Sequence, residues 1–550
     1  MLGRGFWTPD EPREADIAWR MSWQADKAVP LLAGEAFCEK PPLTYWLAAL
    51  PIKWLGAKAW AARLPNLLYA MITALSVGLL ARRSLGKLAG AAAAAVISTF
   101  LLSYQVAIWL ATDAPLLAAV AVALLGLYGG FYADQRPARL RGYLLMHAAL
   151  GAGFLSKSAV AWMVPALALI TLVIWEKRWR ELLRWEFYLG LGLQAAIILT
   201  WVGWVYFGTD GLAHVKVFFW NNLVGRFTHV DAPAGLQYAA AHRNFPGKYL
   251  LELPLYLWPW TLLMVAAARR AWRQRRDSQH DRRALRFAIA TSLPTLAVLS
   301  MAATARNIYL APALPGAALL LGWWAREIWR SPERWDLRAL CATAALLLLA
   351  VVVSAAALIV LGTDAWARLP DRFGFVAISG VGLVGATYLA ARAWLAARRA
   401  QVLPAQIGLL MAYCTLLVGP ASQAYRVVDQ WQDLRAIGYA VQHDTKGRPL
   451  ILLAPDETTR ALIDLYARTE VASLPGPIGE AALGALQMRL AQAPRSLVLV
   501  QLPGRGLSRF TNRDQAPELP WLAATQLRVA QRYALPNGRR YVLLEWLNRS

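Results

Sequence analysis

A few acids and cations mark where chemistry could occur in this 550-residue chain. Asp10 and Glu11 precede Pro12, where acids favour the positive end of a helix. Lys40 follows thirty residues later, and Asp113 stands in an otherwise apolar stretch. An aspartate within hydrocarbon costs about 2.5–3.5 kcal/mol, so such residues usually serve a site. The alternative for Asp113 is a purely structural pairing with a Lys or Arg.

Several further cations share the segments that we predict to lie on the same side of a membrane. They are Arg13, Lys40, Lys157, Arg226, Arg243, Lys248 and Arg306. Arg and Lys bind phosphate oxygens through charge-assisted hydrogen bonds. Each cation taken singly is better explained as a solvated or paired surface charge, and for Arg243 and Lys248 the two explanations are evenly balanced. Together with the acids, they favour an anionic substrate that carries phosphate.

These residues must be positioned by membrane helices. The mean hydropathy is +0.38, 58% of residues are hydrophobic and 16% are charged, which is a membrane composition. A span needs roughly 20 apolar residues to cross about 30 Å of hydrocarbon. Twelve apolar runs approach this length, near 62–81, 88–104, 106–131, 142–155, 159–175, 187–207, 249–268, 285–303, 308–325, 338–361, 373–396 and 402–420.

The distribution of arginine predicts the orientation. Every second loop is basic, namely 82–87, 136–141, 177–184, 269–286, 326–338 and 392–399, whereas the short loops between them carry few cations. The positive-inside rule places the basic loops in the cytoplasm. The outer side then holds residues 1–61, the large loop 208–248 and everything after 420. This orientation requires 142–175 to be two helices around Ser156-Lys157-Ser158, because one helix of that length would be about 51 Å long.

The chain divides into three parts: an outer first loop at 1–61, a helical bundle at 62–420 and a small α/β domain at 421–550. The first loop has the pattern of an amphipathic surface helix. In the last part, strands are expected at 449–454 and 496–502 and helices at 457–468 and 480–493. Two closing strands, 528–535 and 539–546, flank Pro536-Asn537-Gly538, a strong hairpin signal.

Composition also argues against nucleic-acid-binding and disulfide-rich proteins. The net charge of +24 does not indicate nucleic-acid binding, because cytoplasmic loops facing anionic lipid explain most of it. Three cysteines give no disulfide framework. No dense metal-ligand cluster is visible. Glu39 with His214, His229 or His242 is a candidate for a structural divalent metal, although that spacing is uninformative.

The motifs together resemble the polyprenol-phosphate-dependent glycosyltransferases of the GT-C class, in the branch of protein O-mannosyltransferases and lipid A aminoarabinose transferases. The resemblance covers most of residues 8–320. It rests on Asp10-Glu11-Pro12-Arg13, Glu39-Lys40-Pro41-Pro42 with Tyr45-Trp46, Thr112-Asp113-Ala114-Pro115, Gly153-Phe154-Leu155-Ser156-Lys157, Pro259-Trp260 and Arg306-Asn307-Ile308-Tyr309. Relatives begin with a membrane helix just before the acidic pair, so one upstream span is expected. Residue 14 is Glu where many relatives have an aromatic, which leaves sugar specificity open.

The resemblance implies a multi-span GT-C protein of the bacterial inner membrane, with its active site facing the periplasm. The donor would be a sugar on undecaprenyl phosphate, with 4-amino-4-deoxy-L-arabinose the best candidate. The acceptor would be a lipid A phosphate or another periplasmic glycan. Membrane lipids surround the bundle, and no cofactor is required because the sugar arrives on lipid.

The resemblance also implies roles for individual residues. Lys40, with Arg13 and Arg306, would hold the donor phosphate. Asp10 and Asp113 would orient or deprotonate the acceptor, stabilise an oxocarbenium-like sugar or bind the sugar's amine. The other expected substrate contacts are Glu11, Tyr45, Lys157, Arg226 and Tyr309.

Three alternatives remain open. A transporter would place charged or broken helices near the membrane midplane and show an internal repeat, which this sequence lacks. A protein O-glycosyltransferase would use a Ser or Thr acceptor and would need a stronger base. The same chemistry with a hexose or uronic acid donor is the third.

Overall fold

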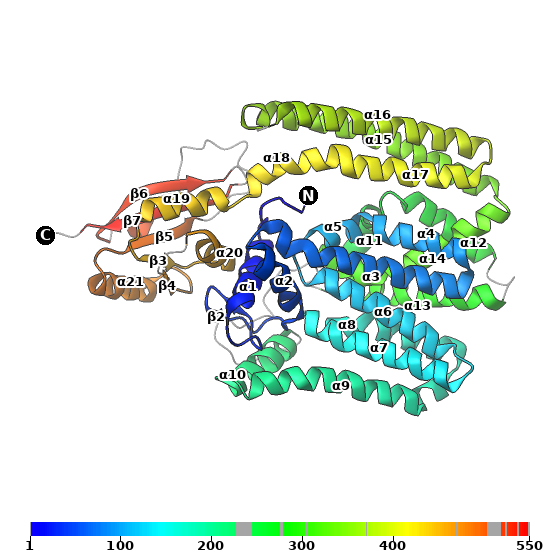
Figure 1. Cartoon of the computed structure of the whole chain (residues 1–550), viewed down its shortest axis with the longest axis horizontal. Coiled ribbons are helices and arrows are strands. Elements are labelled where there is room, and N and C mark those ends of the chain that lie inside the picture. Colours follow the sequence, from blue (N-terminus) through cyan, green and yellow to red (C-terminus); the bar gives the residue numbers. More distant parts are fainter. Residues whose placement is uncertain are drawn as a thin grey trace.

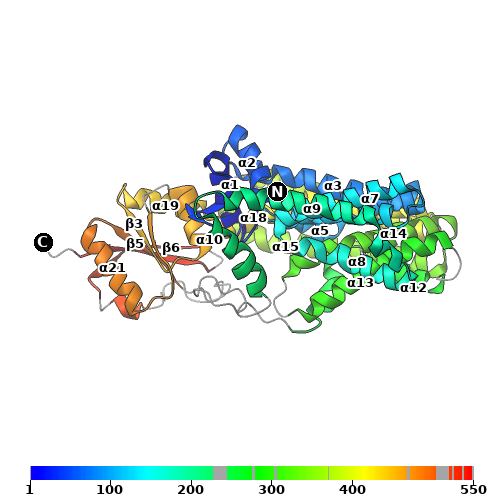
Figure 2. The ribbon, with the colours of Figure 1, turned by 90° about the horizontal axis from the view of Figure 1, so that it is seen from below.

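The computed structural model describes residues 2–226, 245–274, 279–302, 306–369, 371–467, 471–502, 519–522, 525–535 and 538–547. It has a long helical bundle with a small sheet domain at one end (Figure 1). The N-terminal segment lies at the end of the bundle that meets the sheet domain, in both views (Figures 1 and 2). Its elements are α1 (Glu11–Trp23), β1 (Leu31–Leu32), β2 (Glu35–Ala36) and α2 (Leu43–Leu55).

The first half of the bundle is built on α6, a mostly buried helix that carries Asp113 as its first residue. Pro115 is tolerated in that first turn because the amide it lacks has no partner there. The helices of this half are α3 (Ala59–Leu85), α4 (Lys87–Thr99), α5 (Leu101–Ile108), α6 (Asp113–Phe131), α7 (Arg136–Lys157), α8 (Val160–Glu176), α9 (Trp185–Tyr206) and α10 (Gly211–Lys216). Short helical segments follow at η1 (Trp179–Leu183), η2 (Val217–Leu223) and η3 (Val224–Arg226).

The second half of the bundle leads into the sheet domain. Its helices are α11 (Lys248–Tyr256), α12 (Thr261–Arg273), α13 (Gln279–Met301), η5 (Asn307–Ala313), α14 (Leu314–Arg330), α15 (Arg334–Ala365), η6 (Trp366–Arg368), α16 (Arg372–Arg398), α17 (Val402–Leu416), η7 (Leu417–Ala421), α18 (Ser422–Gln432) and α19 (Arg435–Thr445). Large apolar side chains such as Val352, Ile359 and Val381 are exposed on α15 and α16. Such faces suit contact with lipid chains.

The number of spans differs from the prediction of twelve. In the described part of the chain, 8 helices are long and apolar enough to cross a membrane, or up to 10 if two bent pairs count as one span each. The α4–α5 pair bends by 62° and the α11–α12 pair by 108°. The other two predicted spans correspond to α7 and α8. Helix α8 is apolar but shorter than the 18 residues required of a span. The predicted pair of helices within 142–175 is confirmed: α7 ends at Lys157, and Ser158 has a φ of 60° that breaks the helix.

Basic loops gather at the end of the bundle away from the sheet domain (Figure 1). An Arg326 N–H donates to the backbone oxygen of Leu85 at 3.1 Å, which joins the α3–α4 and α14–α15 connections. Likewise, Arg270 of α12 donates to the backbone oxygen of Ser331 at 2.9 Å. The loops that we predict to be cytoplasmic therefore share one end of the molecule.

The C-terminal domain is an α/β sheet with strand order β4-β3-β5-β7-β6. β3 pairs in parallel with β4 and β5, and β7 pairs antiparallel with β5 and β6. One sheet face packs on α19, through Leu450 and Leu452, and the other on α21, through Ile451 and Leu453. The elements are β3 (Leu450–Leu453), α20 (Glu457–Leu462), η8 (Ile463–Ala467), β4 (Val471–Leu474), α21 (Glu480–Gln492), β5 (Leu497–Leu502), η10 (Pro520–Leu522), β6 (Leu527–Ala534) and β7 (Arg540–Trp546).

The predicted strands and helices of this domain are confirmed, but β4 was not predicted from the sequence. The β6–β7 pair has the expected antiparallel hairpin register, while Pro536 and Asn537 lie outside the described residues. The boundary that the sequence suggested at residue 421 falls within a continuous helical stretch, and the sheet begins only at Leu450.

Helix α20 docks the sheet domain on α1. The Thr458 hydroxyl donates to the backbone oxygen of Pro9 at 3.0 Å. Arg20 of α1 forms a salt bridge with Asp464, with 2.6 Å between Nε and Oδ2. These contacts place the N-terminus of α20 beside the N-terminus of α1, where the predicted acids lie.

Candidate active site

Asp10 lies at the start of α1 and is held by two arginines. Arg306, just before η5, donates one N–H to Oδ1 at 3.0 Å and another to Oδ2. Arg13 Nη2 lies 3.4 Å from Oδ1. Burial alone favours the protonated carboxyl, but the hydrogen bonds from Arg306 and the charges of Arg13, Arg306 and Lys40 hold the pKa of Asp10 below its ordinary value. Asp10 is therefore a carboxylate at neutral pH.

Glu14 is the centre of the same cluster, although from the sequence it was noted only as a departure from relatives and was not placed in the site. Its buried carboxylate accepts hydrogen bonds from Arg13 Nη2 at 2.9 Å, Lys40 Nζ at 2.5 Å and the Tyr45 hydroxyl at 2.8 Å. Although burial opposes ionisation, Lys40 and Arg13 keep the pKa of Glu14 below its ordinary value. Asp10, Arg13 and Glu14 are three and four residues apart, so they share one helix face. That spacing is the signal that would have identified Glu14.

The C-terminal domain contributes one acid to the cluster. Arg13 Nη1 forms an ion pair with Glu457, the first residue of α20. Burial disfavours a charged guanidinium, but Glu14, Glu457 and Asp10 raise the pKa of Arg13 above its ordinary value. No local pattern connects residues 444 positions apart, so this contact was not predictable from the sequence.

A second, smaller cluster adjoins the first through η5. Lys157 Nζ lies 2.5 Å from Asp113 Oδ1 and 4.5 Å from the centre of the Tyr309 ring. The backbone N–H of Tyr309 donates to the backbone oxygen of Arg306 at 2.9 Å. Asp113 thus forms the ion pair with a lysine that a purely structural role would require. Through Tyr309 and Arg306, this pair also adjoins the cluster around Asp10.

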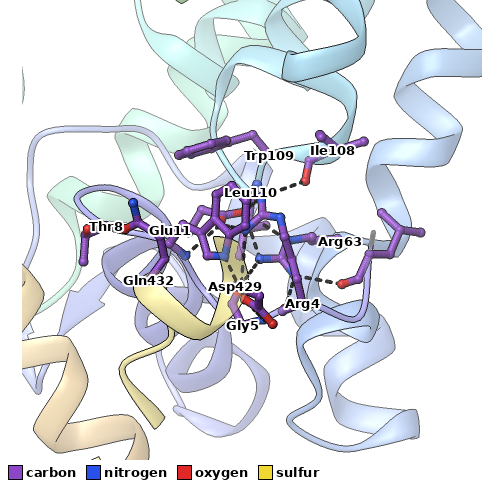
Figure 3. Close-up of polar contacts among 12 residues, drawn as sticks. Arg4, Gly5, Thr8, Glu11, Arg63, Ile108, Trp109, Leu110, Asp429 and Gln432 are labelled. Atoms are coloured by element: carbon purple, nitrogen blue, oxygen red, sulfur yellow. Dashed lines mark hydrogen bonds and ion pairs between the residues drawn. The ribbon is translucent and has the colours of Figure 1, made fainter. Parts of the chain in front are cut away.

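Glu11 has a different environment from the one we predicted (Figure 3). Its fully buried carboxylate accepts hydrogen bonds from Arg63 Nε at 3.0 Å, Arg4 Nη2 at 3.0 Å and the backbone N–H groups of Trp7 at 2.9 Å and Leu110 at 2.8 Å. No atom of the carboxylate faces solvent. The interpretation of Glu11 as a substrate contact is therefore corrected: it anchors α1 to α3 and to the segment before α6.

The same region is tied to α18 (Figure 3). Asp429 accepts hydrogen bonds from the backbone N–H of Gly5 at 2.9 Å and from Trp7 Nε1 at 2.7 Å. The Thr8 hydroxyl donates to Gln432 Oε1 at 3.0 Å. We name this group the Glu11 network; its members are Arg4, Gly5, Trp7, Thr8, Glu11, Arg63, Asp429 and Gln432.

The other predicted residues are only partly described. Arg226 ends η3, but its side chain lies outside the described part of the structure, as do Arg243, His229 and His242 entirely. Lys248 Nζ lies 3.3 Å from Asn307 Oδ1. Within the described ranges, no three His, Cys, Asp or Glu side chains come together as metal ligands. The metal site at Glu39 thus stays a prediction.

The arrangement suits the binding of an anion at a carboxylate-rich surface. Three acids, Asp10, Glu14 and Glu457, balance three cations, Arg13, Lys40 and Arg306. A phosphate that enters this site would replace a carboxylate as the partner of a cation, because each of these cations already forms an ion pair. Charge-assisted hydrogen bonds of similar strength make such an exchange feasible.

The chain is similar to known proteins over part of its length. The family model for dolichyl-phosphate-mannose-protein mannosyltransferase matches residues 39–204. The undecaprenyl phosphate-alpha-4-amino-4-deoxy-L-arabinose arabinosyl transferase of Pseudomonas aeruginosa (strain UCBPP-PA14) is 30% identical over 340 residues, which are 58% of this chain and 56% of that protein. Its namesake from Edwardsiella ictaluri (strain 93-146) is 29% identical over 330 residues, covering 59% and 56%. The chain thus spans about half the length of these curated relatives.

The similarity to solved structures extends further along the chain. ArnT from Cupriavidus metallidurans bound to undecaprenyl phosphate superposes with a TM-score of 0.70 at 18% identity, covering 100% of this chain and 95% of that one. The apo state gives 0.68. The predicted fold is confirmed: a multi-span GT-C membrane protein with a C-terminal sheet domain. The predicted resemblance to lipid-phosphate-dependent glycosyltransferases is also confirmed.

Proposed function

We propose that this protein transfers 4-amino-4-deoxy-L-arabinose from undecaprenyl phosphate to a phosphate of lipid A. The reaction would occur on the periplasmic face of the bacterial inner membrane. The observation that carries the proposal is the cluster of Asp10, Arg13, Glu14, Lys40 and Arg306 at the end of a GT-C bundle opposite its basic loops. The positive-inside rule supports this orientation. The names of the similar arabinosyl transferases support the choice of sugar.

The donor phosphate would bind at Arg306 and Lys40, displacing part of their contacts with Asp10 and Glu14. An oxygen of the acceptor phosphate attacks the anomeric carbon of the sugar. The bond from that carbon to the donor phosphate oxygen breaks, and undecaprenyl phosphate leaves with the bonding electron pair. Arg306 and Lys40 would stabilise the charge that develops on the leaving phosphate. Because the sugar arrives on lipid, the reaction needs no nucleotide.

Asp10 would be an electrostatic group rather than a strong base. Its low pKa makes it a weak proton acceptor, and a phosphate acceptor is already a nucleophile. Once Arg306 turns to the donor phosphate, the carboxylate of Asp10 would face the sugar. There it would stabilise positive charge at the anomeric carbon or orient the acceptor. Asp113 and Lys157 would border the other side of the same space.

Mass spectrometry of lipid A tests the proposal. Cells lacking the protein are compared with cells in which it is restored, and with cells expressing Asp10→Ala. We expect an aminopentose on a lipid A phosphate with the wild type, and its loss with Asp10→Ala. Unchanged lipid A in the restored cells would refute the acceptor and direct the search to other glycans.

A protein acceptor is the second candidate, because the matching family model describes a protein mannosyltransferase. A Ser or Thr hydroxyl must lose its proton during attack, so a base is essential. Asp10→Asn would then abolish transfer, whereas a phosphate acceptor would leave measurable activity. Glycopeptide analysis of exported proteins distinguishes the two candidates.

A further inference from the structure

Among the described members of the cluster around Arg13, one cation and one acid have side chains that are more than two-fifths exposed. The side chain of Arg306 is 46% exposed and that of Glu457 is 42% exposed. Between them, Asp10 is 12% exposed and Glu14 only 1%. Ion pairs link the set in a row, from Arg306 to Asp10, from Asp10 to Arg13 and from Arg13 to Glu457. The row therefore presents opposite charges at its two ends.

Glu457 is firmly positioned at its end of this row. The next residue, Thr458, is hydrogen-bonded to Pro9, which precedes Asp10 in the sequence. The preceding residue, Asp456, caps α20 by accepting from the backbone N–H of Thr459 at 2.7 Å. Arg13 contacts only the Oε2 atom of Glu457. Among the residues that the structure describes, the other carboxylate oxygen has no hydrogen-bond donor, so it is available to a ligand.

We propose that Glu457 forms the subsite for the ammonium group of the donor sugar. This inference rests on the proposed function. An aliphatic amine stays protonated at neutral pH, as lysine does, so an amino sugar linked to phosphate carries opposite charges at its two ends. Its phosphate fits the accessible cation, Arg306, and its ammonium fits the accessible acid, Glu457. Asp10 and Glu14 are less suited, because each is buried and already held by two cations.

The effect of losing this contact follows from its charge. A hydrogen bond to a charged group contributes enough to change an equilibrium about tenfold to hundredfold. Replacing Glu457 by Gln keeps the side-chain shape and an oxygen that accepts from Arg13, so domain docking is retained. The substitution removes the negative charge that the two carboxylate oxygens share, so the ion pair with Arg13 becomes a neutral hydrogen bond and a ligand ammonium loses its counter-charge. A donor that lacks the amine reports the effect of weakening the contact with Arg13, so only the ratio between the two donors isolates the ammonium contact.

The experiment compares two donors on the purified full chain. One is undecaprenyl phosphate-linked 4-amino-4-deoxy-L-arabinose, and the other carries a hydroxyl in place of the amine. The ratio of kcat/KM between the two donors is measured for the wild type, Glu457→Gln and Glu35→Gln. Glu35 is the matched control, because it also forms an ion pair with the C-terminal domain, through Arg460, but its partner is not a member of the cluster and its side chain is 65% exposed.

We expect the wild type and Glu35→Gln to prefer the amino sugar equally. In Glu457→Gln the preference for the amino donor should fall about tenfold or more, because the KM of the amino donor rises more than that of the hydroxyl donor. Because the ratio is internal to each variant, partial loss of folded protein does not alter it. An unchanged ratio in Glu457→Gln would overturn the subsite and leave the proposed function standing. Wild-type protein that uses neither donor would overturn the proposed function, and the subsite with it.

Discussion

Replacing Glu11 by Ala should destabilise the protein strongly, because the substitution leaves two buried guanidinium groups without their counter-charge. Arg63 is fully buried and Arg4 nearly so. Removing one partner of a buried ion pair costs about 3–5 kcal/mol. The backbone N–H groups of Trp7 and Leu110 lose their acceptor as well, so we expect the upper part of that range. Because proteins are stable by only about 5–15 kcal/mol, membrane expression should also fall.

Equilibrium unfolding in mixed micelles, followed by tryptophan fluorescence, measures this change. Glu35→Ala is the control, because Glu35 itself is 65% exposed, and an ion pair whose carboxylate is open to solvent contributes little, about 0–1 kcal/mol. A double-mutant cycle of Glu11→Ala with Arg63→Ala should give a coupling energy of about 1–3 kcal/mol. A Glu11→Ala variant as stable as Glu35→Ala would refute the buried network. A Glu11→Ala variant that keeps the wild-type free energy of unfolding but no longer binds the donor would support the original prediction that Glu11 contacts the substrate.

Three further predictions concern the site and its contact with the C-terminal domain. Lys40→Ala and Asp10→Ala should abolish sugar transfer at normal membrane expression, and normal lipid A modification with either variant would remove the proposed site. Arg226→Ala should weaken acceptor use more than donor binding, and equal changes in the two KM values would contradict this role. Burial, followed by the hydrogen bond and charge of Asp464, raises the pKa of Asp16 well above its ordinary value, so folding favours its protonated form. The stability that protonated Asp16 contributes should be complete below its ordinary pKa of 3.8 and should be lost as the pH rises through the raised pKa. Thermal unfolding measured over a pH series should show this loss in the wild type and not in Asp16→Asn. The same pH dependence in Asp16→Asn would exclude Asp16 as its source.

Local patterns predicted much of the fold. The break between α7 and α8 followed from length, since one helix could not fit the bilayer and Ser158 supplies the turn. The strands β3, β5, β6 and β7 followed from short apolar runs bounded by turn residues. The bends within the α4–α5 and α11–α12 pairs were missed, because hydropathy reports where a chain is apolar and not where its axis changes direction.

Most members of the site cluster were predicted, namely Asp10, Arg13, Lys40 and Arg306, whereas Glu14 and Glu457 were not. Asp10, Arg13 and Lys40 stood out because charged residues are rare beside membrane helices. The contributions of Glu457 and Asp429 depend on pairings with residues more than 400 positions away, for which the sequence has no local signal. Glu11 was assigned to substrate because type and position cannot tell a buried anchor from an accessible ligand. Burial decides that question, and burial comes from the tertiary structure.

The contacts of α1 with the end of the chain set the order in which the protein matures. The first residues are made long before Asp429 and Glu457, which follow the bundle in the sequence. During synthesis, the N-terminal segment lacks these partners until α18 has been made and the sheet domain has folded. A chain stopped before α18 would contain every earlier helix of the bundle but lack the partners that hold Gly5 and Arg13. The cluster around Arg13 is thus completed last, when the C-terminal domain supplies Glu457.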